Sequence, residues 1–94
     1  MDLENNFLIK PLSQLYRDNM VKLSELKRDR EQYYIKLNNR EYIAEMKHKD
    51  YVDLEKAYKE CEKLIEDTQN YIDGVHDARE IIIRIVQNSG KKGI

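Results

Sequence analysis

The sequence predicts an all-α fold in which two long antiparallel helices form a hairpin, and several hairpins assemble into an oligomeric helical bundle. Three observations point to this fold. The 94 residues include only three glycines and one proline, too few for the turns of a β-sandwich or the glycine loops of a nucleotide-binding α/β fold. Apolar residues recur at helical spacing along most of the chain. Charged residues make up 37% of the chain, which suits long helices with solvated outer faces.

The first long helix is expected from about residue 11 to residue 37, after a short N-terminal arm, residues 1–10. Pro11 suits the first turn of a helix, because its missing N–H is not needed there. Arg30 projects in the middle of the apolar face. The apolar residues of that face are Leu12, Leu15, Tyr16, Met20, Leu23, Leu26, Tyr33, Tyr34 and Leu37.

The turn between the helices is expected at Asn38–Asn39, where the phase of the apolar residues slips. Asn38 and Glu41 stand three residues apart, which resembles a capping box. A competing turn is His48–Asp50, in which the aspartate would cap the next helix. The change of phase favours the first of these sites.

The second long helix has the clearest pattern. Gly74 lies within it without changing the apolar phase, so we expect a kink or a helix break there. The hairpin domain would span residues 11–88, and residues 89–94 would form a flexible basic tail. The expected stripe, with about three apolar positions in seven, is typical of a bundle helix rather than of a narrower coiled-coil seam. Nine of its ten main positions are apolar: Leu54, Ala57, Cys61, Leu64, Thr68, Tyr71, Val75, Ala78, Ile82 and Ile85.

The pairing of the two helices follows from the position of the turn. Folding back at Asn38–Asn39 places Tyr16 near Cys61 and predicts an ion pair between Arg30 and Asp50. The charges agree with such a contact, since residues 17–49 hold nine basic and six acidic residues. Residues 50–80 hold four basic and ten acidic ones.

An uncovered apolar overhang follows from this pairing. The first helix would end opposite about residue 66, and the second would continue for roughly 30 Å at 1.5 Å per residue. Because a free monomer rarely exposes so large an apolar surface, we expect it to contact another copy of the chain or another protein. The predicted interface residues are Tyr71, Ile72, Val75, Ala78, Ile81, Ile82, Ile83, Ile85 and Val86.

An alternative function is a ligand-binding or sequestering oligomer, with a pocket between subunits for an anionic ligand such as a nucleotide. Basic and aromatic residues of the first helix would line that pocket: Arg28, Arg30, Tyr33, Tyr34 and Arg40. A weaker alternative is a nucleic-acid binder. The net charge of −1 provides no overall field that would attract nucleic acid.

Enzymatic motifs, cofactor motifs and metal-binding motifs do not stand out in the sequence. Cys61 lies in the apolar stripe and is expected to be an unreactive core residue. His76 has acidic neighbours, Asp73, Asp77 and Glu80, but all four lie on the solvated face and lack a second histidine at ligand spacing. The sequence therefore predicts a non-enzymatic interaction protein, acting as an adaptor, an assembly factor or an inhibitor, without a metal or cofactor.

A cytoplasmic location is expected from the single cysteine, which cannot form an internal disulfide. The N-terminus lacks the basic start and apolar core of a signal peptide. No apolar run is longer than the three residues of Ile81–Ile83, far shorter than a membrane-spanning helix, so no contact with a membrane is expected.

Overall fold

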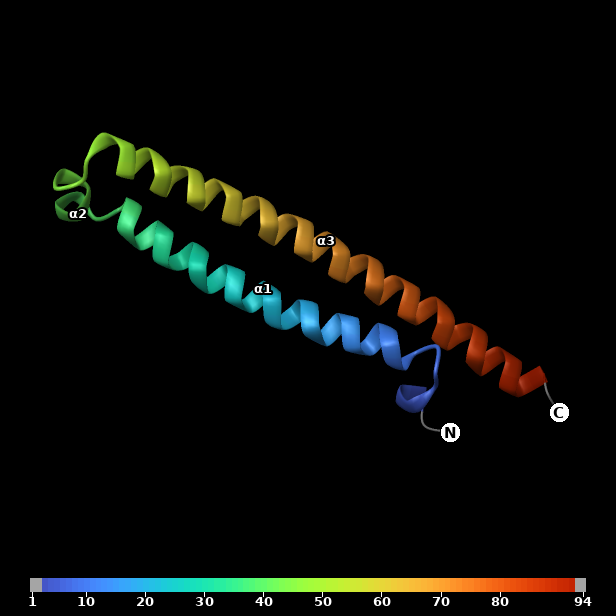
Figure 1. The fold of residues 1–94 in the computed structure, drawn as a ribbon. Helices are drawn as coiled ribbons and strands as arrows, with labels where there is room; N and C mark the ends of the chain where they lie inside the picture. Colours follow the sequence, from blue (N-terminus) through green and yellow to red (C-terminus); the bar gives the residue numbers. More distant parts are fainter. Residues whose placement is uncertain (1–2, 93–94) are drawn as a thin grey trace.

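The computed structural model describes residues 3–92 and is helical along nearly all of that length (Figure 1). A short 3-10 helix, η1 (Leu3–Asn5), precedes the long helix α1 (Lys10–Leu37). The five-residue helix α2 (Arg40–Ala44) connects α1 to α3 (His48–Lys92). The molecule measures 73 × 17 × 16 Å, and residues 3–92 contain no strand. The expectation of an all-helical chain with long helices is confirmed.

The start of α1 is set by Asn6 and Pro11. The Asn6 side chain accepts a hydrogen bond from the backbone N–H of Leu8 (2.8 Å). The backbone carbonyl of Asn6 accepts one from the backbone N–H of Lys10 (2.8 Å). Pro11 occupies the first turn, where a helix has no use for its missing N–H. The observed helix therefore agrees with the expected boundaries to within one residue at each end.

The chain turns twice between the long helices, at Asn38–Asn39 as expected and again at residues 45–47. The competing turn, His48–Asp50, instead forms the first turn of α3. The chain leaves α1 at Asn38, and the Asn39 side chain caps α2 by accepting a hydrogen bond from the Tyr42 N–H (3.1 Å). The chain turns again after Ala44, and α3 begins at His48. The prediction that Asn38 is the cap was wrong, because its side chain instead donates to the Tyr34 carbonyl (2.8 Å).

The helix α3 continues without a break through Gly74, so the alternative of a third helix beginning there was wrong. Residues 89–92, expected in a flexible tail, belong to α3. The remainder of that expected tail, residues 93–94, and residues 1–2 of the expected arm lie outside the described residues.

The contact between α1 and α3 is a seam of side chains spaced alternately three and four residues apart, which is the spacing of a coiled coil. All of its members are buried or half-buried. In α1 and just before it they are Ile9, Leu12, Tyr16, Asn19, Leu23, Leu26, Arg30, Tyr33 and Leu37. In α3 they are Tyr51, Leu54, Tyr58, Cys61, Ile65, Thr68, Ile72, Val75 and Arg79.

The seam is narrower than the predicted three-in-seven stripe. Leu64, Tyr71 and Ile85 were expected in the core, yet 47%, 49% and 57% of their surface is exposed. They lie beside the seam because two helices in contact bury only two positions in seven. A third position is buried only where a further helix packs against the pair.

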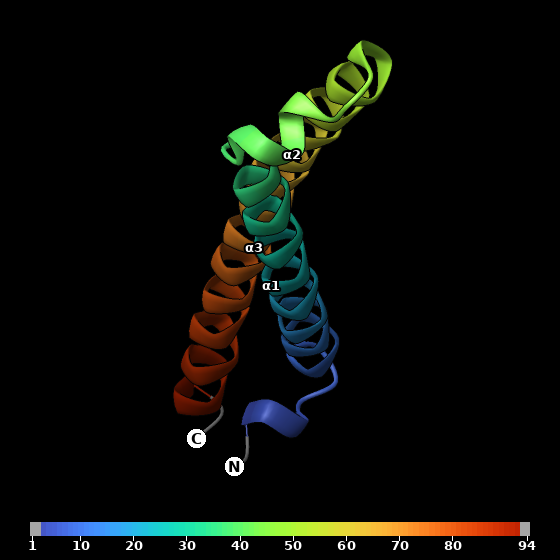
Figure 2. The ribbon, with the colours of Figure 1, turned by 90° about the vertical axis from the view of Figure 1, so that its left-hand side faces the viewer.

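The register also differs from the expectation. The Cys61 thiol donates to the Leu26 carbonyl (3.2 Å), ten residues further along α1 than Tyr16, the predicted neighbour. The cause is the connection, since residues 38–47 belong to neither long helix. As a result α1 reaches as far along α3 as Arg79. Figure 2 shows the two helices crossing at an angle, with the last turns of α3 apart from α1.

Candidate functional site

The predicted interface residues fall into three groups in the structure. Ile72 and Val75 are only 3% and 8% exposed, because they belong to the seam with α1. Ile81 and Ile85 are more than half exposed, as is nearly half of Tyr71. The remaining four residues are half-buried: Ala78, Ile82, Ile83 and Val86. The overhang thus begins after Arg79, whereas the first helix was expected to end opposite about residue 66.

One edge of the seam carries a second line of apolar side chains. Leu64, Tyr71, Ala78 and Ile85 follow one another at seven-residue intervals along α3, and such residues lie on one face of a helix in this geometry. Lys22 lines a groove of about 370 Å³ together with Leu64 and Tyr71, so it marks the same edge on α1.

Two further apolar residues extend this line. Leu15 precedes Lys22 by seven residues and therefore shares its edge of α1. Asp67 lines the same groove as Lys22 and therefore lies at the same edge. Ile81 follows Asp67 by fourteen residues, which is two seven-residue repeats, so it lies on the same face of α3. We call the resulting surface the apolar flank: Leu15, Leu64, Tyr71, Ala78, Ile81 and Ile85.

Gly74 lies within the apolar flank, seven residues after Asp67. A Cβ atom placed on Gly74 would meet nothing within 4 Å. No packing within the described part of the chain therefore requires a glycine at this position. A glycine in a helix interior costs about 1 kcal/mol relative to alanine, so its presence suits a surface that another backbone approaches closely.

The opposite edge of the seam carries a polar groove of about 520 Å³ near the start of α1. Its lining residues are Asn5, Lys10, Ser13, Tyr16, Arg17, His76 and Arg79. Two of them join the helices, since Arg79 Nε donates a hydrogen bond of 2.8 Å to the buried Ser13 Oγ. The rings of Tyr16 and His76 also face each other across the helices, with centroids 6.2 Å apart. Sequence reasoning missed this basic groove because it depends on the register.

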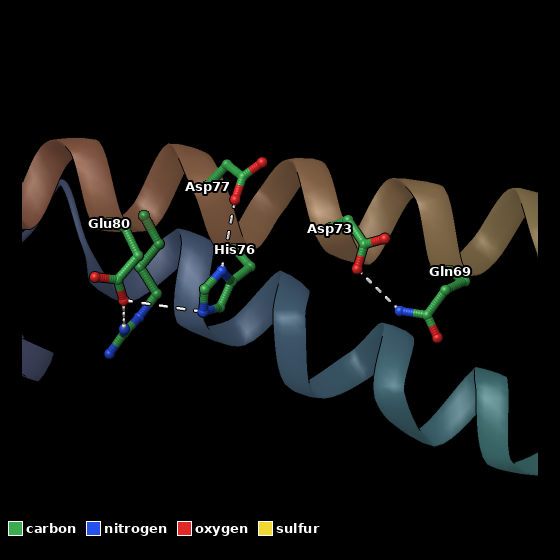
Figure 3. Close-up of polar contacts among 6 residues, drawn as sticks. Gln69, Asp73, His76, Asp77 and Glu80 are labelled. Carbon is green, nitrogen blue, oxygen red and sulfur yellow. Dashed lines mark hydrogen bonds and ion pairs between the residues drawn. The ribbon is translucent and has the colours of Figure 1, made fainter.

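Two acidic residues contact His76: Asp77 lies on the outer side of α3, and the Glu80 carboxylate lies on the same side of α3 as the His76 ring (Figure 3). His76 Nδ1 lies 3.7 Å from Asp77 Oδ1, and His76 Nε2 lies 4.0 Å from Glu80 Oε1. Asp73 instead accepts a hydrogen bond from Gln69 (3.0 Å), one turn earlier. Within residues 3–92, no group of three or more histidine, cysteine, aspartate or glutamate side chains is placed to hold a metal ion.

Within one chain the residues of the alternative ligand pocket are only partly brought together, with Arg30 and Tyr34 both near Tyr58. Tyr33 lines a groove beside Cys61 on the edge of the apolar flank. Tyr34 is on the other edge, with its ring centroid 6.4 Å from that of Tyr58. Arg28 is exposed, and Arg40 begins α2.

The predicted ion pair between Arg30 and Asp50 does not form. Asp50 lies in the exposed first turn of α3, while Arg30 occupies the seam beside Tyr58. Burial and the nearby Glu62 carboxylate raise the pKa of the Tyr58 hydroxyl, and the Arg30 charge acts in the opposite direction. The ten-residue error in register explains the wrong partner.

Cys61 is buried in the seam as expected. Burial is the main cause that raises the pKa of its thiol, and the charge of Asp29 adds to it. A raised pKa keeps the sulfur in its protonated, poorly nucleophilic form. Cys61 therefore acts as a small core residue that also donates a hydrogen bond to Leu26.

The fold and these two surfaces define a coiled-coil-like helix pair with one apolar and one basic edge. Comparison with protein families, with curated proteins and with solved structures finds no match. In the described part of the chain, no helix has a stretch both long and apolar enough to cross a membrane.

Proposed function

We propose that this chain is a non-enzymatic interaction protein that self-associates through its helices and binds another protein, acting as an adaptor, assembly factor or inhibitor. The observation that carries the proposal is the apolar flank. Its exposed side chains continue for more than twenty residues along α3, from Leu64 to Ile85. We place this activity in the cytoplasm, where the free thiol of Cys61 would stay reduced.

The apolar flank leaves a large apolar surface to be buried by a partner. Complete burial of a leucine or isoleucine side chain is worth about 1.5–3 kcal/mol. Leu64, Ile81 and Ile85 each expose about half of their surface, so a helix packed on them gains a substantial part of that energy. The three-in-seven pattern of α3 then has a direct explanation, because two positions pack on α1 and the third packs on the added helix.

A second copy of the chain is a suitable partner. Its own apolar flank would pack against the first, and four helices would then surround one core, as in a four-helix bundle. Gly74 and Ala78, both small, would allow the two α3 helices to approach closely. The overhang after Arg79, with Ile82, Ile83 and Val86, continues this surface and offers further contacts to a different protein.

The experiment compares two double variants by sedimentation velocity. Ile81→Asp/Ile85→Asp places two charges on the apolar flank, and Val21→Asp/Ile35→Asp places two charges on exposed apolar positions of α1 away from it. We expect the wild type and the α1 variant to be oligomers and the flank variant to be a monomer, because an unpaired buried charge is very unfavourable. Circular dichroism should show that both variants remain helical.

Two results would refute the proposal. If the wild-type protein is a monomer at micromolar concentrations, the proposed self-association is wrong. Equal dissociation of both variants would show that the flank is not the surface used, and that the outer face of α1 contributes as much.

A further inference from the structure

The basic groove at the edge opposite the apolar flank has the size and chemistry of a small-molecule site. Its volume of about 520 Å³ lies within the range of about 300–1,000 Å³ in which ligand pockets are usually found. We propose that this groove binds a phosphate-bearing small molecule of the size of a nucleotide. This site is distinct from the residues 28–40 that the sequence suggested for an anionic ligand.

The charges of the groove favour an anion. Lys10 and Arg17 are seven residues apart on α1 and both are exposed on the same edge. Arg79 adds a third cation from α3, so the positive groups approach a ligand from two directions. None of the described side chains that line the groove is acidic. Glu80 forms an ion pair with Arg79, since its Oε1 lies 3.7 Å from Arg79 Nη1, and it also lines a second groove on α3 together with Asp77.

The Arg79 guanidinium is held in place before any ligand arrives. Its side chain is only 22% exposed, and its Nε donates to Ser13 Oγ, which is itself buried. A guanidinium fixed in this way binds an anion with a smaller loss of side-chain entropy than a freely moving one. Phosphate suits such a group because its oxygens accept several charge-assisted hydrogen bonds at once.

The aromatic side of the groove distinguishes a nucleotide from a bare phosphate. The Tyr16 and His76 rings, tilted by 47° to each other, belong to the same lining as the three cations. Aromatic side chains stack on nucleobases with about 1–3 kcal/mol per base. A ligand with both a phosphate and a planar ring therefore matches more of this groove than either part alone. An extended nucleic acid matches less well, because the overall charge is −1 and residues 50–80 are acidic.

The test is isothermal titration calorimetry with pyrophosphate, AMP, ATP and adenosine on the full chain. We expect AMP and ATP to bind most tightly, pyrophosphate to bind more weakly, and adenosine not to bind. Lys10→Gln/Arg17→Gln should weaken AMP binding about tenfold or more, since a hydrogen bond to a charged group contributes about 1.5–3 kcal/mol. The control, Lys22→Gln/Lys36→Gln, removes the same charge from the other edge of α1 and should leave the affinity within about twofold.

Four results would overturn the proposal. The first is the absence of binding by every phosphate compound at about 1 mM, the limit of weak specific binding. The second is equal weakening by the two double variants, which would indicate overall charge rather than the groove. The third is adenosine binding as tightly as AMP. The fourth is a single-stranded oligonucleotide that displaces AMP at a lower concentration than ATP does, which would assign the groove to nucleic acid.

Discussion

Arg79 and Ser13, 66 residues apart in the sequence, are joined by a hydrogen bond of 2.8 Å from Nε to Oγ near the end of the seam. Ser13 is 5% exposed, so its hydroxyl is shielded from water. The bond fixes the register of α1 against α3, and it also orients the guanidinium in the basic groove. One contact therefore connects the fold of the pair to its proposed ligand site.

Replacement of Ser13 by alanine should lower the free energy of unfolding by about 1–2 kcal/mol, because Arg79 loses an acceptor in a shielded position. Ser24→Ala, an exposed serine on the same helix, is the matched control and should change stability by less than about 0.5 kcal/mol. Urea unfolding followed by circular dichroism measures both. Equal effects of the two substitutions would mean that the bond contributes nothing to the register.

Stability should fall as the pH rises above the ordinary thiol pKa of about 8.5. The pKa of Cys61 is raised in the folded chain, chiefly by burial, so the unfolded chain releases its proton first. The stability linked to this group is present below the unfolded pKa and is lost as the pH rises toward the folded one. The raised pKa of Tyr58, due mainly to burial, acts in the same sense at higher pH.

The measurement is the urea midpoint of the wild type and of Cys61→Ala between neutral and alkaline pH. Cys61→Ala should be less stable at neutral pH, because it loses the contact with Leu26, but its midpoint should fall less steeply with pH. Parallel curves for the two proteins would show that the thiol titrates alike in the folded and unfolded chain.

Gly74 provides a test of the apolar flank that does not introduce a charge. Gly74→Ala should raise the free energy of unfolding by about 0.8–1 kcal/mol, since the glycine lies in a continuous helix and a Cβ there meets nothing within 4 Å. Leucine has nearly the same helix propensity as alanine, so Gly74→Leu should stabilise the single chain about as much as Gly74→Ala. Its larger side chain should weaken self-association, whereas alanine should not.

Thermal melts and sedimentation velocity of both Gly74 variants check this expectation. If leucine and alanine leave the association constant equally unchanged, no helix packs close to Gly74, and the flank contact must lie nearer to Leu64 or Ile85.

The helices could be predicted from the sequence more accurately than their contact. Pro11 and the asparagines at the end of α1 are local signals, and local signals fix helix ends. The register was not predictable in the same way, because a single turn at Asn38–Asn39 and a connection of ten residues that includes α2 both fit the polar residues there. The basic groove depends on that register, so Ser13 and Arg79 carried no recognisable signal.

The width of the seam shows a second limit. Periodicity predicted Leu64 as a main position of the apolar stripe, and its neighbour Ile65 is equally apolar. The structure buries Ile65 and leaves Leu64 half exposed. Apolar periodicity predicts which side chains are buried in the final assembly. It does not predict whether the helix that buries them belongs to the same chain or to another one.

Two leucines separate folding from association for this reason. Leu23 is 3% exposed in the seam, so Leu23→Ala should lower the free energy of unfolding by about 2–5 kcal/mol. Leu64 is 47% exposed, so Leu64→Ala should cost the single chain less than about 1 kcal/mol. If the apolar flank is an interface, Leu64→Ala should instead raise the dissociation constant of the oligomer by about tenfold.

Thermal unfolding at a concentration below the dissociation constant measures the first effect, and sedimentation equilibrium measures the second. Loss of stability from Leu64→Ala as large as that from Leu23→Ala, at low concentration, would place Leu64 inside the core of the single chain. A Leu64→Ala protein with unchanged stability and unchanged association would leave Leu64 as an ordinary surface residue. The apolar flank would then be restricted to its distal part, from Tyr71 to Ile85, where Ile81 and Ile85 are more than half exposed.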